Sequence, residues 1–133
     1  MFICDLNDSQ KKAFLIVGIQ FIHIDGEVTI DEKKLFELMR REASVKIPPD
    51  AKDLDRLELI EAFDTDQSKI ILLLELLHLG YIDGEFSQPE HDFLIEFSEK
   101  LGFSEDQLTT YAHWVLGNIA WQHEAAKFWA NGS

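Results

Sequence analysis

A short acidic phrase occurs twice in this chain, 58 residues apart. It reads Ile-Asp-Gly-Glu-Val-Thr over residues 24–29 and Ile-Asp-Gly-Glu-Phe-Ser over residues 82–87, and each copy is followed by a glutamate three positions after the hydroxyl residue. The similarity continues upstream at the same offset, so we interpret residues 8–39 and 66–97 as an internal duplication. Because two copies are too few for a solenoid, we expect one pseudo-symmetric domain over residues 1–133.

The spacing of apolar residues predicts helices and no strand, so we expect an all-α, single-domain bundle of about six to seven helices. In the first copy, a helix should run from residue 8 or 9 to about residue 24, where Gly26 ends it. Thr29 and Glu32 form a capping-box pattern, which predicts a second helix that ends near residue 43. A shorter helix over residues 50–63 should connect the two copies. We expect three residues of the second helix to face the core: Leu35, Leu38 and Met39.

The second copy predicts the same pair of helices. Residues 67–82 are apolar around nearly the whole helical circumference, so we expect this helix to be central and buried. Ser87 and Glu90 repeat the capping-box pattern at the start of the next helix. A third pattern of this kind opens a C-terminal helical region over residues 104–130, which we expect to be kinked or split at residues 117–118.

Composition restricts the partners of the chain. It has 25 acidic and 12 basic residues, a net charge of −13, and no block of Lys or Arg that would contact phosphates. We therefore expect no nucleic-acid partner, whereas divalent cations or a basic protein surface would fit the charge. A plain solvated acidic surface is the alternative. Cys4 is the single cysteine, so the chain has neither a disulfide framework nor a thiolate zinc site.

The apolar segments are too short for a membrane span. The most apolar one covers residues 70–82 and contains Glu75 and His78, whereas crossing a bilayer takes about 20 apolar residues. Residues 1–8 carry acids and no basic n-region, unlike a secretory signal. We therefore expect no membrane insertion and a cytoplasmic location.

Each acidic loop gathers three carboxylates within eight residues. An aspartate at the end of a helix also lies beside the negative end of the helix dipole, which is unfavourable. Such crowding requires a cation or good solvation, and all-oxygen ligands favour Ca²⁺, Mg²⁺ or Mn²⁺. The alternative is that these acids cap helices and face water. The candidate metal ligands are Asp25, Glu27, Glu32, Asp83, Glu85 and Glu90.

Two known metal-binding patterns fit the chain poorly. An EF-hand would need oxygen ligands at the positions that Phe21 and His23 occupy in the first copy, and both residues fall in a predicted helix. Glu75 and His78 have the Glu-x-x-His spacing of di-iron bundles, but such a centre needs a second motif of this kind and the sequence has none. We interpret Glu75 and His78 as a satisfied, buried or half-buried polar pair. No nucleophile elbow or phosphate-binding glycine loop is present, so no enzymatic activity and no catalytic residue are predicted.

The C-terminal region carries more large aromatic residues than one helix face needs. We expect them mainly to cover the bundle, and the alternative is an exposed patch for a partner or a dimer mate. These residues are Trp114, Trp121, Phe128 and Trp129.

In the duplicated pattern, an apolar helix ends in Ile-Asp-Gly-Glu and is followed by Ser/Thr-x-x-Glu and a second apolar helix. This pattern resembles the TerB-like tellurite-resistance family over about residues 8–112. Residues 82–104 are especially similar to it. The resemblance implies an all-helical bundle of two pseudo-symmetric halves, a cytoplasmic setting, and an acidic metal-binding surface linked to tellurite and other stress responses. It places that surface on the same six carboxylates.

From these observations we expect a non-enzymatic, divalent-cation-binding helical module that acts through protein contacts in a stress response. A metal-independent scaffold or dimerisation module that uses the Trp-rich C-terminal helix is the alternative. A carboxylate-bridged metal enzyme ranks third.

Overall fold

The computed structural model describes residues 1–84 and 86–130. Within these residues the chain is built from α-helices and short 3-10 turns, without a strand, so the predicted all-α class is confirmed. The 3-10 turns cover Ile3–Asp5 and Ala51–Asp53. The helices are α1 (Asp8–Ile22), α2 (Ile30–Ala43), α3 (Arg56–Ile60), α4 (Asp66–Tyr81), α5 (Gln88–Lys100) and α6 (Glu105–Ala130).

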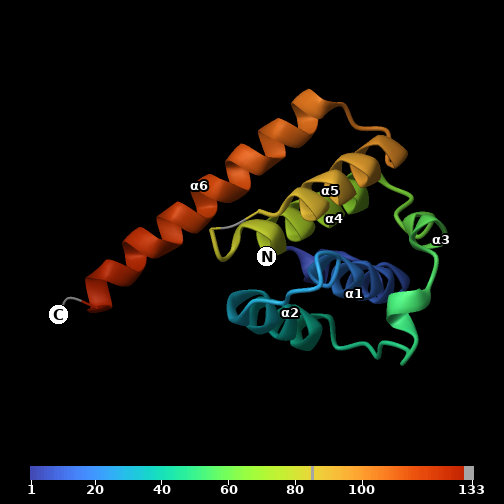
Figure 1. The fold of residues 1–133 in the computed structure, drawn as a ribbon, viewed down its shortest axis with the longest axis horizontal. Coiled ribbons are helices and arrows are strands. Elements are labelled where there is room, and N and C mark those ends of the chain that lie inside the picture. The colour runs from blue at the N-terminus through green and yellow to red at the C-terminus, as the bar shows by residue number, and fades with distance from the viewer. Residues whose placement is uncertain (85, 131–133) are drawn as a thin grey trace.

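Helix α4 lies at the centre of the bundle. It contacts α1, α2, α5 and α6, and Figure 1 shows it between the α1–α2 pair and α6. Apolar side chains occupy nearly every side of this helix, so it can only be stable when other helices cover it. The prediction of a central, buried helix is confirmed. Its fully buried leucines are Leu72, Leu73, Leu76 and Leu79.

Reciprocal capping fixes where the helices begin. The capping boxes expected at Thr29 with Glu32 and at Ser87 with Glu90 are both present. Helix α1 is capped by Asn7 rather than by residue 8 or 9, because the Asn7 side chain accepts from the Gln10 amide while Gln10 returns a bond to the Asn7 amide. Such reciprocal bonds satisfy amides that the helix itself leaves unpaired.

The segment between the two copies differs from the prediction. Residues 50–63 do not form one helix but the 3-10 turn at Ala51–Asp53 and the five-residue α3. Leu54 is in an extended conformation, and the Asp55 side chain then accepts from the Leu57 amide and starts a new helix. A side-chain cap inside an apolar pattern therefore splits the predicted helix.

Helix α6 also differs from the prediction, because it is one continuous helix without a break at residues 117–118. Its first half packs on the bundle through Leu108, Val115 and Ile119. Its second half runs beyond the other helices (Figure 1), and Trp121, Phe128 and Trp129 are 67%, 76% and 71% exposed. The expectation that these aromatic residues cover the bundle is therefore wrong.

Helix α2 buries one side only. Met39 is buried and Leu35 is half-buried, as expected, whereas Leu38 is exposed together with Ile30. The apolar stripe of α2 is therefore wider than the surface that α1 and α4 cover. None of the helices in the described part of the chain is both long and apolar enough to cross a bilayer.

Candidate cation pocket between the two acidic loops

The α1–α2 loop and the α4–α5 loop meet at one pocket of about 250 Å³. Each loop follows a helix that ends before a glycine in the left-handed region, with φ of +81° at both Gly26 and Gly84. A residue with a Cβ adopts this conformation only at a cost, so glycine suits both turns. The pocket is lined by Asp25, Glu27, Thr29 and Glu32 from the first loop and by Asp83, Phe86, Ser87 and Glu90 from the second.

Five of the six predicted ligands therefore line the same pocket. The sixth, Glu85, lies outside the described residues. The sequence predicted two separate acidic loops, and the packing of α1 and α2 against α4 and α5 brings them together. The pattern of acids in the sequence did not indicate Phe86 as part of the site, and it indicated only capping roles for the Thr29 and Ser87 hydroxyls.

Glu32 and Glu90 form the inner part of the pocket because capping holds them there. The Thr29 amide donates to Glu32 Oε1 at 3.0 Å, and the Ser87 amide donates to Glu90 Oε1 at 3.1 Å. The Ser87 hydroxyl donates to the same Glu90 oxygen at 3.0 Å. Both glutamates are buried, with 3% and 4% of their surface exposed. Two carboxylates are thus taken out of water on facing helix starts.

This arrangement leaves Glu90 electrostatically unsatisfied. Burial and the neighbouring Glu32 raise the pKa of Glu90 to about 7, against the lowering effect of its bonds to Ser87. Its second oxygen, Oε2, is buried without a hydrogen-bond partner in the described part of the chain. A buried carboxylate oxygen without a donor is costly, so a proton or a cation at this position would stabilise it.

The outer carboxylates are more exposed than the inner pair. Asp25 and Glu27 face solvent, and the Asp25 carboxylate accepts from the Glu27 amide at 3.0 Å. Asp83 is half-buried. Across the residues with described positions, no three Asp, Glu, His or Cys side chains lie together closely enough to hold one metal ion. A cation here would therefore require Asp25, Glu27 or Asp83 to change rotamer toward the inner pair. This costs little for the exposed Asp25 and Glu27, and more for Asp83, which is half-buried and already makes an interaction.

Phe86 closes one side of the pocket and packs against α4 at Gly80. A Cβ at Gly80 would lie 2.2 Å from Phe86 Cε2, so only glycine leaves room for the ring. Phe86 also packs against Tyr81, with the two rings tilted by 32° and their centroids 4.5 Å apart. The second loop is thus fixed to the central helix by an aromatic side chain, which keeps Glu90 facing Glu32.

Glu75 and His78 lie away from this pocket, deep in α4. Glu75 accepts from the Phe2 amide at 2.9 Å and is 3.1 Å from the Met1 ammonium. Neither ring nitrogen of His78 has a partner within the residues described, so this residue is not the satisfied polar side chain that we expected. Burial, together with the nearby positive amino terminus, lowers the pKa of His78 to about 4.

Comparisons of this chain with models of protein families, with curated proteins and with solved structures find no match.

Proposed function

We propose that the chain is a non-enzymatic helical module that binds a divalent cation at the pocket between its two acidic loops. The observation that carries this proposal is the convergence of Asp25, Glu27, Glu32, Asp83 and Glu90, from two loops 58 residues apart, on one small pocket. Helix capping alone would not require the two loops to meet.

The chemistry of the pocket favours a hard cation. The side chains that line it offer carboxylate and hydroxyl oxygens and neither sulfur nor imidazole, which suits Ca²⁺, Mg²⁺ or Mn²⁺. Glu90 Oε2 has no donor in the described structure, and its carboxylate faces the charge of Glu32. A cation between Glu32 and Glu90 would remove this repulsion, and Asp25, Glu27 and Asp83 would complete its oxygen ligands after rotation.

Cation binding is tested by calorimetric titration of metal-stripped protein with Ca²⁺, Mg²⁺ and Mn²⁺. We expect saturable binding of at least one of these ions, and a loss of about 10-fold or more in affinity in Glu90→Gln and in Asp25→Asn/Asp83→Asn. Gln is suited to position 90 because it keeps an oxygen that accepts from the Ser87 amide. Glu96→Gln is the matched control, since Glu96 is an exposed residue of the same helix.

Two results would count against this function. One is the absence of heat with each ion up to about 1 mM, the weak end of the range for calcium sites in proteins. The other is binding that Glu96→Gln reduces as much as Glu90→Gln does, because the ions would then respond only to net charge.

We place this module, by its sequence resemblance, with the TerB-like proteins as a cytoplasmic component of a tellurite or general stress response. Residues 8–39 and 66–97 would then be its two pseudo-symmetric repeats, with α1 and α4 and likewise α2 and α5 starting at equivalent positions. In this mechanism the bound cation neutralises the acidic loops, stiffens the helix starts and changes the surface that is offered to a protein partner. Growth of a deletion strain on tellurite, with and without the Glu90→Gln gene, tests the physiological part.

A second candidate function is dimerisation through α6. Trp114, Trp121 and Phe128 recur at seven-residue spacing with Asn118 and Ala125 between them, which is the spacing of a helix-pairing seam. All three aromatic residues are exposed in the single chain. Residues 114–130 contain one acid and one base, so this part of a chain with net charge −13 can approach a second copy without repulsion.

The exposed area is sufficient for a weak dimer. A buried aromatic side chain contributes about 150–250 Å², so the exposed aromatic residues of α6 would bury roughly 1,000 Å² over two copies, near the lower limit of specific interfaces. By sedimentation velocity we expect a concentration-dependent dimer that Trp121→Gln/Phe128→Gln abolishes. Leu57→Gln, which changes an exposed leucine on α3, should leave it intact. A monomer at every concentration would remove this candidate.

A further inference from the structure

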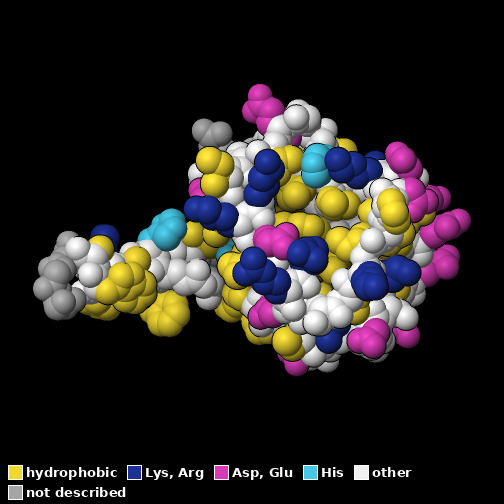
Figure 2. Space-filling view, turned by 90° about the horizontal axis from the view of Figure 1, so that it is seen from below, with side chains coloured by type: hydrophobic (Ala, Val, Ile, Leu, Met, Phe, Trp, Pro, Cys, Tyr) yellow, Lys and Arg dark blue, Asp and Glu magenta, His cyan; other side chains and the backbone are white. Residues whose placement is uncertain are grey.

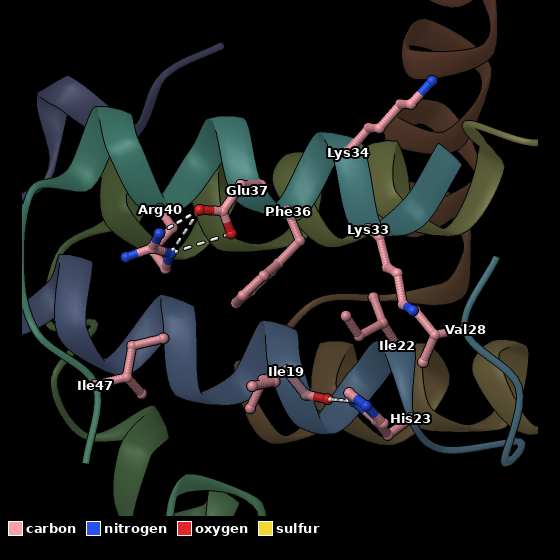
Figure 3. A pocket seen from close by; sticks show the side chains of 10 residues that line it. All are labelled: Ile19, Ile22, His23, Val28, Lys33, Lys34, Phe36, Glu37, Arg40 and Ile47. Carbon is pink, nitrogen blue, oxygen red and sulfur yellow. Dashed lines mark hydrogen bonds and ion pairs between the residues drawn. The ribbon is translucent and has the colours of Figure 1, made fainter. Parts of the chain in front are cut away.

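A second pocket, a groove of about 570 Å³, lies between α1 and α2 and is separate from the acidic pocket. Figure 3 shows its apolar floor, which is made by Ile19 and Ile22 of α1, Phe36 of α2 and Ile47. The Phe36 ring packs against Gly18, where a Cβ would lie 3.1 Å from Phe36 Cε1. Because Phe36 and Ile22 are buried, the floor is held by the core and does not need a ligand to form.

The rim of the groove is basic although the chain is strongly acidic. Lys33 and Arg40 of α2 line it, and since seven residues separate them they stand about 10 Å apart along the helix. Glu37 lies between them and pairs with Arg40. On the α1 side, His23 Nδ1 is hydrogen-bonded to the Ile19 carbonyl at 2.8 Å.

Among the acids of α2, Glu37 lines the groove and pairs with Arg40, whereas the other three do not line it. Asp31 and Glu42 are each two residues from a basic rim residue, so they project from nearly the opposite flank of the helix. They do not line the groove, and Glu32 is buried in the acidic pocket. The groove wall formed by α2 therefore presents an excess of positive charge, in a chain whose net charge is −13.

Exposed apolar and charged side chains continue across α2, where Asp31 lies one turn before Lys34. A further hollow of about 310 Å³ on the outward side of the helix is lined by Lys34, Glu37, Leu38 and Arg41. Leu38 is exposed there, as is Ile30 one turn from Lys34. Figure 2 shows Lys and Arg side chains around exposed apolar side chains on one face of the molecule. The continuous surface is wider than a small molecule would cover, and exposed apolar surface bounded by charge is typical of protein interaction sites.

We propose that the groove between α1 and α2 binds an acidic amphipathic helix of a partner protein. Leucine-like side chains at positions i, i+3, i+4 and i+7 of that helix fill the apolar floor, as in other helix-in-groove complexes. Carboxylates two turns apart on its flank pair with Lys33 and Arg40, whose spacing along α2 matches two turns. This interaction does not depend on cation binding at the acidic loops.

A short helix fits this surface better than an anionic membrane does. Charges interact over a Debye length of about 8 Å at physiological ionic strength, so a narrow helix experiences mainly the basic rim. A membrane surface is wide and would also face the surrounding acidic residues of a chain with net charge −13. The rim therefore favours a narrow acidic ligand over a broad one.

The test uses a fluorescein-labelled synthetic peptide of about 18 residues, long enough for a stable helix on binding. It carries leucines at i, i+3, i+4 and i+7 with glutamates beside them, and a second peptide carries lysines in place of the glutamates. By fluorescence anisotropy we expect saturable binding of the Glu peptide and none of the Lys peptide. Lys33→Glu should weaken the Glu peptide at least 10-fold, while Lys69→Glu, the same charge change on α4, should not.

Two results decide the proposal: where on the protein the peptide binds, and how its binding depends on the charge at position 33. Amide shift changes confined to residues 19–23 and 33–47, and gain of Lys-peptide binding in Lys33→Glu, would support the groove. Equal binding of both peptides, no binding of either, or an unchanged affinity in Lys33→Glu would overturn it. Binding to phosphatidylserine–phosphatidylcholine vesicles in place of the peptide would also overturn it and assign the surface to membranes.

Discussion

Glu90→Gln will stabilise the protein at pH 8 and will lose this advantage at pH 4.5. Burial and the neighbouring Glu32 raise the pKa of Glu90 to about 7 from an ordinary value of 4.5. At pH 8 the folded protein must therefore hold a carboxylate charge that its surroundings disfavour. A difference of this size in pKa corresponds to roughly 3 kcal/mol between the two ends of the titration.

The direction follows from proton linkage. Because the folded pKa lies above the unfolded one, the folded state binds the proton more tightly, and the contribution of Glu90 to stability is present below pH 4.5. It is lost as the pH rises through about 7. Glutamine at position 90 has no proton to lose, so its advantage over glutamate grows across this window.

Urea denaturation at pH 8 and pH 4.5, in metal-free buffer, measures the effect. We expect Glu90→Gln to be more stable than wild type at pH 8 by about 1–2 kcal/mol, less than the full pKa difference because Glu32 shares the titration, and to differ little at pH 4.5. Glu96→Gln on the exposed side of α5 should differ little from wild type at both pH values. A destabilised Glu90→Gln at pH 8 would mean that the carboxylate is well solvated in the folded protein. Saturating the wild-type protein with a bound cation should remove much of the difference.

His78→Leu will protect the protein against acid. His78 is 5% exposed and its ring nitrogens have no partner in the described part of the chain. Burial lowers the pKa of His78 to about 4 from 6.5, helped by the positive amino terminus. Below pH 6.5 the His78 side chain becomes protonated in the unfolded chain but stays neutral in the folded protein. The free energy of unfolding of the wild-type protein therefore falls by up to about 3 kcal/mol as the pH falls to 4.

Leucine has a similar size and cannot ionise, so the variant should lack this loss. The free energy of unfolding, measured in urea at pH 7, 5.5 and 4, should fall less steeply in His78→Leu than in wild type. His113→Leu is the control, because His113 is exposed on α6 and should keep the wild-type slope. Parallel slopes for all three proteins would show that His78 takes up a proton in the folded state.

The two titrations act in opposite directions over nearly the same range of pH. Acidification from 7 to 4.5 stabilises the fold through Glu90 and destabilises it through His78. The pH profile of the wild-type protein therefore shows only their difference. Each contribution becomes visible when the other residue is replaced, which is why the two variants should be measured together.

Local rules predicted much of the fold. The capping boxes at Thr29 and Ser87 and the buried helix at residues 66–81 each depend on residues close in sequence, and all are present. The Asn7 cap was missed because three neighbouring polar residues can all start a helix. The prediction of one helix over residues 50–63 was wrong because Asp55 caps a new helix inside an apolar pattern.

Features that depend on the size of the folded body were not predictable. The aromatic residues of α6 have the composition of a core face, but the bundle ends before Trp121 and leaves this residue exposed. Leu38 was likewise assigned to the core because its spacing fits, although α1 and α4 cover a narrower stripe of α2. The sequence also identified the acidic loops one at a time. That they share a pocket depends on how two helix pairs pack, which no local pattern encodes.

The reciprocal caps at Thr29 and Ser87 connect the pocket to local opening of the chain. Glu32 and Glu90 each use one oxygen to hold the amide of the residue that caps their helix, while the same side chain lines the pocket. A proton or an ion that binds the remaining carboxylate oxygens of Glu32 and Glu90 changes the strength of these hydrogen bonds to the amides. The rate at which the Thr29 and Ser87 amides exchange with solvent would then follow the occupancy of the pocket. The first turns of two helices would open and close together, although they are 58 residues apart in the chain.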